Sequence, residues 1–72
     1  MSLTKIVSDN VRYYRHKAGL TQEAVGYKSK LHPDYIGRLE RGQESISIPN
    51  LEKLAKVLKV DPYVLLMPRN NE

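Results

Sequence analysis

Residues 19–42 read GLTQEAVGYKSKLHPDYIGRLERG, and this stretch decides which fold the chain adopts. Thr21 is a favourable N-cap residue, which predicts that a short helix begins directly after it. The run Ser29-Lys30-Leu31 interrupts the apolar pattern and marks a turn. Proline suits the first turn of a helix, so Pro33 predicts a second short helix that begins at position 32 or 33 and ends at Gly42. The stretch therefore predicts two short helices joined by a tight turn.

Gly26 lies in the middle of the first of these helices. A residue this small is needed where two helices cross at close range. Val25 is expected to pack against Ile36 and Leu39 of the second helix and to form an apolar wedge between the two. Such a pair is the helix-turn-helix arrangement, which leaves the second helix free to enter the major groove of DNA.

Helical spacing continues on both sides of this stretch. Upstream, apolar residues recur every three or four positions until Gly19 ends the helix: Leu3, Val7, Val11, Tyr14 and Ala18. Downstream, Ser47 can cap a helix with a second apolar stripe: Leu51, Leu54, Ala55 and Leu58. Asp61-Pro62 predicts the cap and first turn of a last short helix that ends at Met67. No stretch reads as a strand with a partner, so we expect an all-α fold of five helices.

The length and composition fit one small domain. The chain has 72 residues, of which 40% are hydrophobic. We expect residues 1–68 to form the domain and residues 69–72 to form a flexible C-terminal tail. The longest apolar run, Tyr63–Met67, is far shorter than the roughly 20 residues that a membrane span needs, and no signal peptide is recognisable. We therefore expect no membrane contact and a cytoplasmic location.

Catalysis and cofactor binding are not expected. The chain has no cysteine, and its two histidines, His16 and His32, are too few for a structural metal site. No nucleophile stands at a recognisable spacing from an activating base, and the four scattered glycines form no phosphate-binding loop. The sequence thus indicates a protein that is not an enzyme and uses no metal or cofactor.

The positive charge is concentrated in one part of the chain. The net charge is +4; residues 1–42 carry eight basic and four acidic side chains, and residues 43–72 carry four of each. Basic charge confined to one part of a chain suits a polyanionic partner such as nucleic acid, although a solvated surface gives the same count.

Several motifs resemble those of the XRE/Cro family of helix-turn-helix regulators, which includes phage repressors. The pattern R-x-x-R-x-x-x-G-L-T-Q-E is met by residues 12–23, I-x-x-L-E-x-G by residues 36–42, and V-D-P-x-x-L-L by residues 60–66. The resemblance covers about residues 6–67. It implies a five-helix, lambda-repressor-like DNA-binding domain.

Residues 31–36 and 40–47 resemble the controller proteins of restriction–modification systems, which are free-standing dimers of about this length. Small phage and sporulation-type repressors are nearly as similar. Pro33-Asp34 departs from the Arg-Thr that controllers often have, so the recognised DNA sequence is expected to differ. The family usually has glycine or asparagine where this chain has Lys30, and a positive φ at that lysine would cost on the order of 1 kcal/mol.

Four residues of the second helix are expected to read DNA bases because they face away from its apolar side: His32, Pro33, Asp34 and Arg38. Arg38 is the strongest candidate, since a guanidinium can donate two hydrogen bonds to O6 and N7 of guanine. Asp34 either accepts from cytosine N4 or caps the helix N-terminus. His32 either donates to a phosphate or caps the same helix.

A larger group is expected to contact the DNA backbone: Arg12, Thr21, Gln22, Lys28, Lys30, Tyr35, Arg41 and Ser45. The resemblance implies a phosphate contact for Gln22, and the backbone N–H groups at the start of its helix add donors there. The resemblance also implies that Arg15 and Glu40 form an ion pair between the first and third helices. We therefore expect Arg15 to be structural.

The last helix carries more apolar residues than one core can take. Leu65 can enter the core, whereas Tyr63, Val64, Leu66 and Met67 are expected to form a two-fold dimer interface. Two recognition helices would then lie roughly 34 Å apart, one turn of DNA, and read a near-palindrome.

These features together predict a homodimeric, sequence-specific regulator of transcription that binds double-stranded operator DNA. Its further partner could be RNA polymerase, and it could act as a repressor or as a controller protein. Two alternatives stay open: an antitoxin whose main partner is a toxin protein, and a protein–protein adaptor that keeps the fold without binding DNA.

Overall fold

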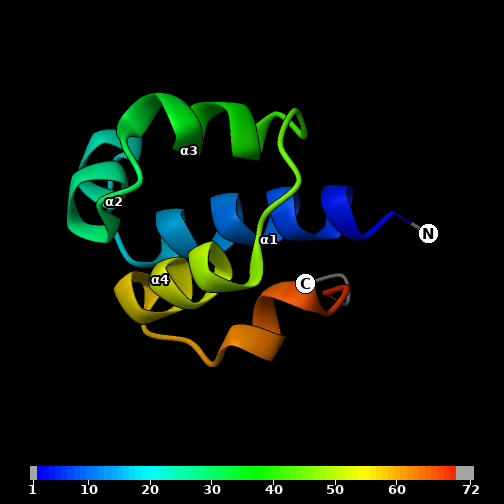
Figure 1. Cartoon of the computed structure of the whole chain (residues 1–72). Coiled ribbons are helices and arrows are strands. Elements are labelled where there is room, and N and C mark those ends of the chain that lie inside the picture. Colours follow the sequence, from blue (N-terminus) through cyan, green and yellow to red (C-terminus); the bar gives the residue numbers. More distant parts are fainter. Residues whose placement is uncertain (1, 70–72) are drawn as a thin grey trace.

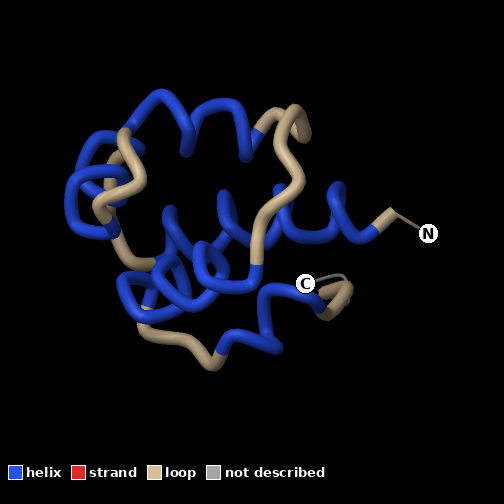
Figure 2. The backbone as a smooth tube through the Cα atoms, in the orientation of Figure 1, coloured by secondary structure: helices blue, strands red, loops and turns tan. Residues whose placement is uncertain are grey.

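The computed structural model describes residues 2–69, which fold into four α-helices and a 3₁₀ helix (Figures 1 and 2). The helices are α1 (Leu3–Lys17), α2 (Gln22–Ser29), α3 (Pro33–Glu40), α4 (Ile48–Leu58) and η1 (Pro62–Leu66). The described residues contain no strand. The all-α prediction is confirmed, with one difference: the last of the five expected helices is a 3₁₀ helix and ends one residue earlier than predicted.

The helices surround one core, with α1 running through the middle of the molecule. Figure 1 shows α3 along one edge, η1 along the opposite edge, and α1 and α4 between them. The buried apolar residues come from all five elements: Val7, Val11, Val25, Ile36, Leu39, Leu51, Leu54, Ala55, Leu58 and Leu65. Because Ile36 and Leu39 lie in this core, the other face of α3 is turned outward.

Side-chain caps begin the first four helices. The hydroxyls of Ser2, Thr21 and Ser47 each accept a hydrogen bond from the backbone N–H three residues later. His32 caps α3 through its ring nitrogen Nδ1. The expected side-chain cap at Asp61 is wrong, because this residue makes no side-chain hydrogen bond at the start of η1. The backbone carbonyl of Asp61 accepts from Val64 N at 2.9 Å instead, and Pro62 occupies the first turn.

Helices α2 and α3 touch at Gly26, as the sequence predicted. A Cβ atom at this position would lie 2.3 Å from the backbone nitrogen of Pro33. Any side chain would therefore force α3 away from α2. Val25 is fully buried beside this contact, together with Ile36 and Leu39.

The turn between α2 and α3 contains two residues with positive φ that are not glycine. Lys30 has φ of 64° and His32 has φ of 83°. The carbonyl oxygen of Gly26 accepts hydrogen bonds from both Leu31 N and His32 N, and these bonds hold the turn closed. The positive φ at Lys30 follows the conditional prediction, whereas the one at His32 was not predicted.

Two residues of the upstream apolar stripe do not lie in the core. Leu3 is 55% exposed, and Ala18, the C-cap of α1, is also exposed. Helical spacing identified the face of α1 correctly, but the helix extends beyond the core at both ends. The side chain of Leu3 therefore contributes to the apolar surface of the protein.

Asn10, a buried polar residue of α1, anchors the C-terminal segment. Its Nδ2 donates to the carbonyl oxygens of Leu65 at 2.9 Å and Met67 at 2.8 Å, and its Oδ1 accepts from Arg69 Nε at 3.1 Å. Arg69, expected to begin a flexible tail, also stacks on the Tyr13 ring at 3.9 Å. The remainder of that expected tail, residues 70–72, lies outside the described residues.

The close contact at Gly26 predicts a large loss of stability in Gly26→Ala. The new methyl group overlaps the backbone of Pro33, which cannot rotate away, so the free energy of unfolding should fall by about 3 kcal/mol or more. Gly37→Ala is the matched control on α3, because its Cβ would meet only the ends of two side chains, Arg41 Nη1 at 3.3 Å and Gln22 Oε1 at 3.5 Å. Thermal and urea unfolding should leave that variant within about 1 kcal/mol of the parent. Equal effects of the two substitutions would contradict the proposed close contact.

The left-handed turn predicts that Lys30→Gly stabilises the fold. Glycine adopts positive φ without steric cost, so the free energy of unfolding should rise by about 0.5–1 kcal/mol. Lys28→Gly removes the same charge from within α2 and should lower stability by a similar amount. Denaturant unfolding of both variants checks the opposite signs, and a loss of stability in Lys30→Gly would show that the turn is not under this strain.

Candidate nucleic-acid interface

The outward face of α3 and the start of α2 together form an open hollow. It has a volume of about 280 Å³ and is lined by Gln22, Pro33, Asp34, Gly37, Arg38 and Arg41. Five of these six residues belong to α3 or directly follow it. Three of the four candidate base-reading residues thus line the hollow, and the fourth, His32, caps the same helix.

Arg38 projects from α3 and is held by an acidic residue of the following loop. Its Nε donates to Oε2 of Glu44 at 2.8 Å. The sequence analysis did not predict this contact. The two residues are six apart across the end of a helix, a spacing that produces no helical or strand pattern.

His32 takes the capping role of the two that the sequence left open. Its Nδ1 accepts the backbone N–H of Asp34 at 3.1 Å, so the ring proton must lie on Nε2 when the ring is neutral. Asp34 is exposed in the first turn of α3, where its carboxylate interacts favourably with the helix dipole. Both side chains are at the end of α3 that borders the hollow.

A buried ion pair joins α1 to α3 beneath this face. Arg15 Nε contacts Glu40 Oε2 at 2.6 Å, and Arg15 Nη2 donates to Glu40 Oε1 at 3.0 Å. Arg15 Nη1 donates to the carbonyl oxygen of Leu20 at 3.0 Å. The side chains are 11% and 4% exposed, so both charges depend on each other for solvation.

Gln22 extends this network to α2. Its Nε2 donates to Glu40 Oε1 at 3.0 Å, so Glu40 receives hydrogen bonds from both α1 and α2. The sequence analysis assigned Gln22 only to a phosphate. One of the two Nε2 hydrogens of Gln22 is therefore used inside the protein. The other hydrogen and the backbone N–H groups at the start of α2 can still donate to an acceptor outside the protein.

Three other phosphate candidates also make internal contacts. Arg12 Nη2 donates to the backbone carbonyl of Glu40 at 3.0 Å, Arg41 Nε to Gln43 Oε1 at 3.4 Å, and Asn50 Nδ2 to the hydroxyl of Tyr35 at 3.4 Å. Arg12 and Arg41 are nevertheless exposed. Thr21 and Ser45 are exposed too, the former as the cap of α2 and the latter in the loop before α4.

Lys28 and Lys30 lie in a different hollow from the one on α3. They line a surface depression of about 330 Å³ together with Ser29, Val57 and two further lysines, Lys53 and Lys56. The structure therefore separates these two phosphate candidates from the residues that line the α3 hollow.

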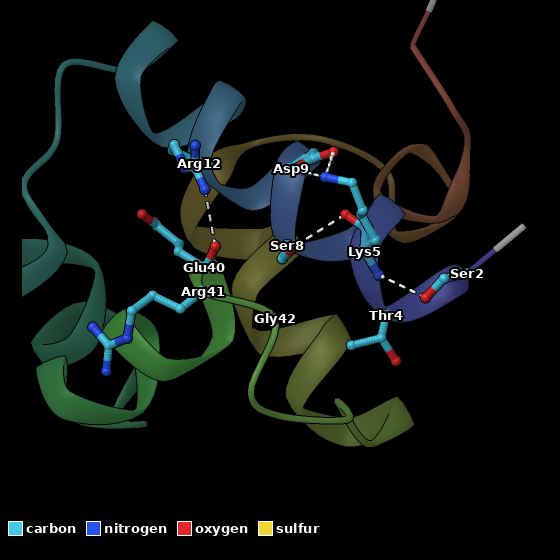
Figure 3. A pocket seen from close by; sticks show the side chains of 9 residues that line it. All are labelled: Ser2, Thr4, Lys5, Ser8, Asp9, Arg12, Glu40, Arg41 and Gly42. Atoms are coloured by element: carbon cyan, nitrogen blue, oxygen red, sulfur yellow. Dashed lines mark hydrogen bonds and ion pairs between the residues drawn. The ribbon is translucent and has the colours of Figure 1, made fainter.

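A polar hollow of about 310 Å³ lies between the start of α1 and the end of α3 (Figure 3). Most of its charged side chains have a partner within the chain, whereas Arg41 reaches only the neutral side chain of Gln43. Lys5 Nζ contacts Asp9 at 3.2 Å, Arg12 donates to the Glu40 carbonyl, and the Glu40 carboxylate binds Arg15. This hollow therefore presents few free charges to a ligand.

Apolar residues gather where the start of α1, the loop before α4 and the C-terminal segment meet (Figure 1). A groove of about 260 Å³ is lined mainly by Leu3, Val7, Ile46, Ile48, Leu51 and Leu66. Tyr63 and Met67 are exposed, whereas Val64 and Leu66 are half-buried. The dimer interface predicted from the sequence contained the residues of the last helix and not Leu3, Ile46 or Ile48, because only that helix carried more apolar residues than one core can take.

No cluster of metal-ligating side chains is present among the residues that the structure describes. Within the same residues, no helix is both long and apolar enough to cross a membrane.

Comparison with known proteins decides the family. The helix-turn-helix family matches residues 11–65, which include the two crossed helices and the core of the fold. The chain belongs to the helix-turn-helix family. The prediction of that family from residues 12–23 and 36–42 is confirmed.

Other members of the helix-turn-helix family include control proteins. This chain is 40% identical over 50 residues to control protein C.BamHI of Bacillus amyloliquefaciens, a match that covers 69% of this chain and 62% of that protein. It is 38% identical over 66 residues to control protein C.SmaI of Serratia marcescens, covering 92% and 79%. A solved structure of the restriction–modification controller protein C.Esp1396I, a tetramer in complex with its natural 35-base-pair operator, has a TM-score of 0.82 and 35% identity, covering 90% and 86%.

The buried ion pair predicts that Arg15→Ala is strongly destabilising. It leaves the Glu40 carboxylate buried without its main partner, so the free energy of unfolding should fall by about 3–5 kcal/mol. Arg12→Ala is the matched control, because it removes an exposed arginine that makes one hydrogen bond to the same residue, and it should cost about 1 kcal/mol or less. Chemical unfolding measures both, and an Arg15→Ala variant with the parent's melting temperature would refute the structural role.

Proposed function

We propose that the chain is a sequence-specific regulator of transcription that binds double-stranded operator DNA as a homodimer. The observation that carries this proposal is the exposed face of α3, on which Arg38 and Arg41 border one open hollow beside the N-terminus of α2. A helix-turn-helix protein places such a face in the major groove. The operator complex of C.Esp1396I, a similar protein, supports the same use of the fold.

In this proposal one group of residues contacts the DNA bases and a second group contacts the phosphates. Arg38 reads guanine, while His32, Pro33 and Asp34 at the start of α3 contact neighbouring bases. The phosphate contacts that hold the helix in register come from a wider group: Arg12, Thr21, Gln22, Lys28, Lys30, Tyr35, Arg41 and Ser45. Arg15 and Glu40 act beneath them as structural residues.

The homodimer would form through the apolar surface around η1. Tyr63 and Met67 are 61% and 52% exposed, which is unfavourable in water unless a second surface covers them. Val64 and Leu66 border the same segment. Pairing through this surface leaves α3 open, since Figure 1 places α3 and η1 at opposite edges. A two-fold dimer of this kind would read a near-palindromic site.

We further infer that residues 1–68 act as one domain in the cytoplasm, without a cofactor and without catalysis. Two relatives of the chain are control proteins, and this supports a regulatory role. RNA polymerase or a toxin protein could be an additional partner.

Selection from random DNA duplexes at about 150 mM salt tests the proposal. Sequencing of the retained duplexes should show a near-palindrome with half-sites one turn apart. If the dimer contacts about eight phosphates, the logarithm of the binding constant should fall with that of salt concentration with a slope near −7. No enrichment together with a flat salt dependence would refute DNA binding and favour the adaptor or the antitoxin.

Arg38→Ala should relax the preference at a single base pair of each half-site and weaken binding to the enriched duplex by about 1–3 kcal/mol. Lys28→Ala is the control, because it removes the same charge outside the α3 hollow and should leave the enriched sequence unchanged. Repeating the selection with both variants checks this, and an unchanged sequence with Arg38→Ala would rule out base reading by that residue.

A further inference from the structure

Among residues 2–69, Glu44 is the only residue that accepts a hydrogen bond from the Arg38 side chain. The Nε–Oε2 distance of 2.8 Å is that of a strong, charge-assisted hydrogen bond. The side chains are 45% and 29% exposed, so the pair lies at the surface but is partly shielded from water. Within residues 2–69, no side chain or carbonyl accepts a hydrogen bond from the terminal nitrogens Nη1 and Nη2 of Arg38.

The loop after α3 determines where the Glu44 carboxylate lies. Gly42 turns the chain back with φ of 76°, and its N–H donates to the carbonyl of Leu39 at 3.0 Å. The next N–H, that of Gln43, donates to the backbone carbonyl of Arg38 itself at 2.9 Å. Glu44 also lines the apolar groove together with Ile46, and its side chain is 29% exposed.

This arrangement leaves one edge of the guanidinium available. Contact with guanine O6 and N7 uses two parallel N–H donors, and the free Nη1 and Nη2 can provide them while Nε stays on Glu44. A free arginine side chain samples many rotamers, and its immobilisation opposes binding. An arginine already held by a carboxylate loses less of that freedom when it meets a base.

The carboxylate has a second effect that acts on all DNA sequences. Glu44 lies next to a surface that approaches phosphates, and like charges repel. The negative charge therefore weakens contact with any duplex, whereas the fixed guanidinium favours only a duplex with guanine at the right place. The two effects both widen the difference between specific and non-specific affinity.

We propose that Glu44 is a positioning residue that holds Arg38 ready to read guanine and lowers affinity for other DNA. The proposal rests on the proposed DNA-binding function. Glu44, which lies outside α3, would then help to determine which DNA sequence the α3 surface prefers.

Three variants test the proposal on the enriched duplex, on a duplex with the Arg38-dependent base pair changed, and on unrelated DNA. Glu44→Ala removes both charge and acceptor; we expect it to bind unrelated DNA two- to five-fold more tightly and to lose five- to ten-fold of its discrimination at that base pair. Glu44→Gln keeps a neutral acceptor and should fall between parent and Glu44→Ala. Glu52→Ala on α4 removes the same charge from an exposed residue and should retain the discrimination.

Two DNA-binding outcomes would overturn the proposal. Tighter binding of Glu44→Ala to all three duplexes with the parent's ratios would show that Glu44 only repels DNA. An equal loss of discrimination in Glu52→Ala would show that the position of the charge is unimportant. In a protein that already carries Arg38→Ala, the further substitution Glu44→Ala should cause no additional loss of discrimination, because Glu44 acts through Arg38.

A measurement without DNA separates this proposal from the proposed function. The Nε–H resonance of Arg38 should be protected from solvent exchange in the parent and should lose that protection in Glu44→Ala, while the melting temperature stays unchanged. An identical resonance in both proteins would overturn the positioning role, whether or not the chain binds DNA. A protected resonance in a protein that enriches no DNA sequence would instead refute the proposed function and, with it, any reading of guanine.

Discussion

The buried ion pair between Arg15 and Glu40 fixes the position of α3 relative to α1. Glu40 also accepts from Gln22, so one carboxylate joins three helices at the edge of the core. Separating either charge from its partner would leave that charge buried and poorly solvated. The free-energy cost of doing so holds α1 and α3 in one relative position. The Gly26 contact then brings α2 and α3 close enough for their outward residues to share a surface. The geometry of the α3 hollow depends on these two constraints.

The molecule separates two surfaces of different chemistry. The α3 face presents arginines and a glutamine, while the surface around η1 and the start of α1 presents exposed apolar side chains. The two surfaces meet at Glu44, which lines the apolar groove and accepts from Arg38, but η1 and α3 lie at opposite edges of the molecule, so a second copy of the chain can cover η1 without blocking α3 (Figure 1). Asn10 links the two regions structurally, since it anchors the C-terminal segment onto the same helix that carries Arg15. Dimerisation and DNA contact can therefore occur at the same time in one small domain.

The sequence predicts those features that arise from local spacing. The order of the helices and the close contact at Gly26 depend on helical periodicity and near neighbours, and both are found in the structure, with helix ends that differ by one or two residues. Contacts across the end of a helix or between two helices have no such signal, so the Arg38–Glu44 and Gln22–Glu40 hydrogen bonds were missed. Periodicity also shows which side of α1 is apolar but not where the core ends, so the exposure of Leu3 at the start of the stripe was not predicted. The candidate base-reading and phosphate-contacting roles stay predictions.

The central claim is that the outward face of α3 is the surface that meets DNA. Titration of the ¹⁵N-labelled chain with its selected duplex, followed residue by residue in amide spectra, tests it most directly. The largest shifts should fall on Gln22, His32, Asp34 and residues 37–41. Shifts confined to the lysine hollow at Lys28 and Lys53, or to the apolar groove at Leu3 and Ile48, would contradict it.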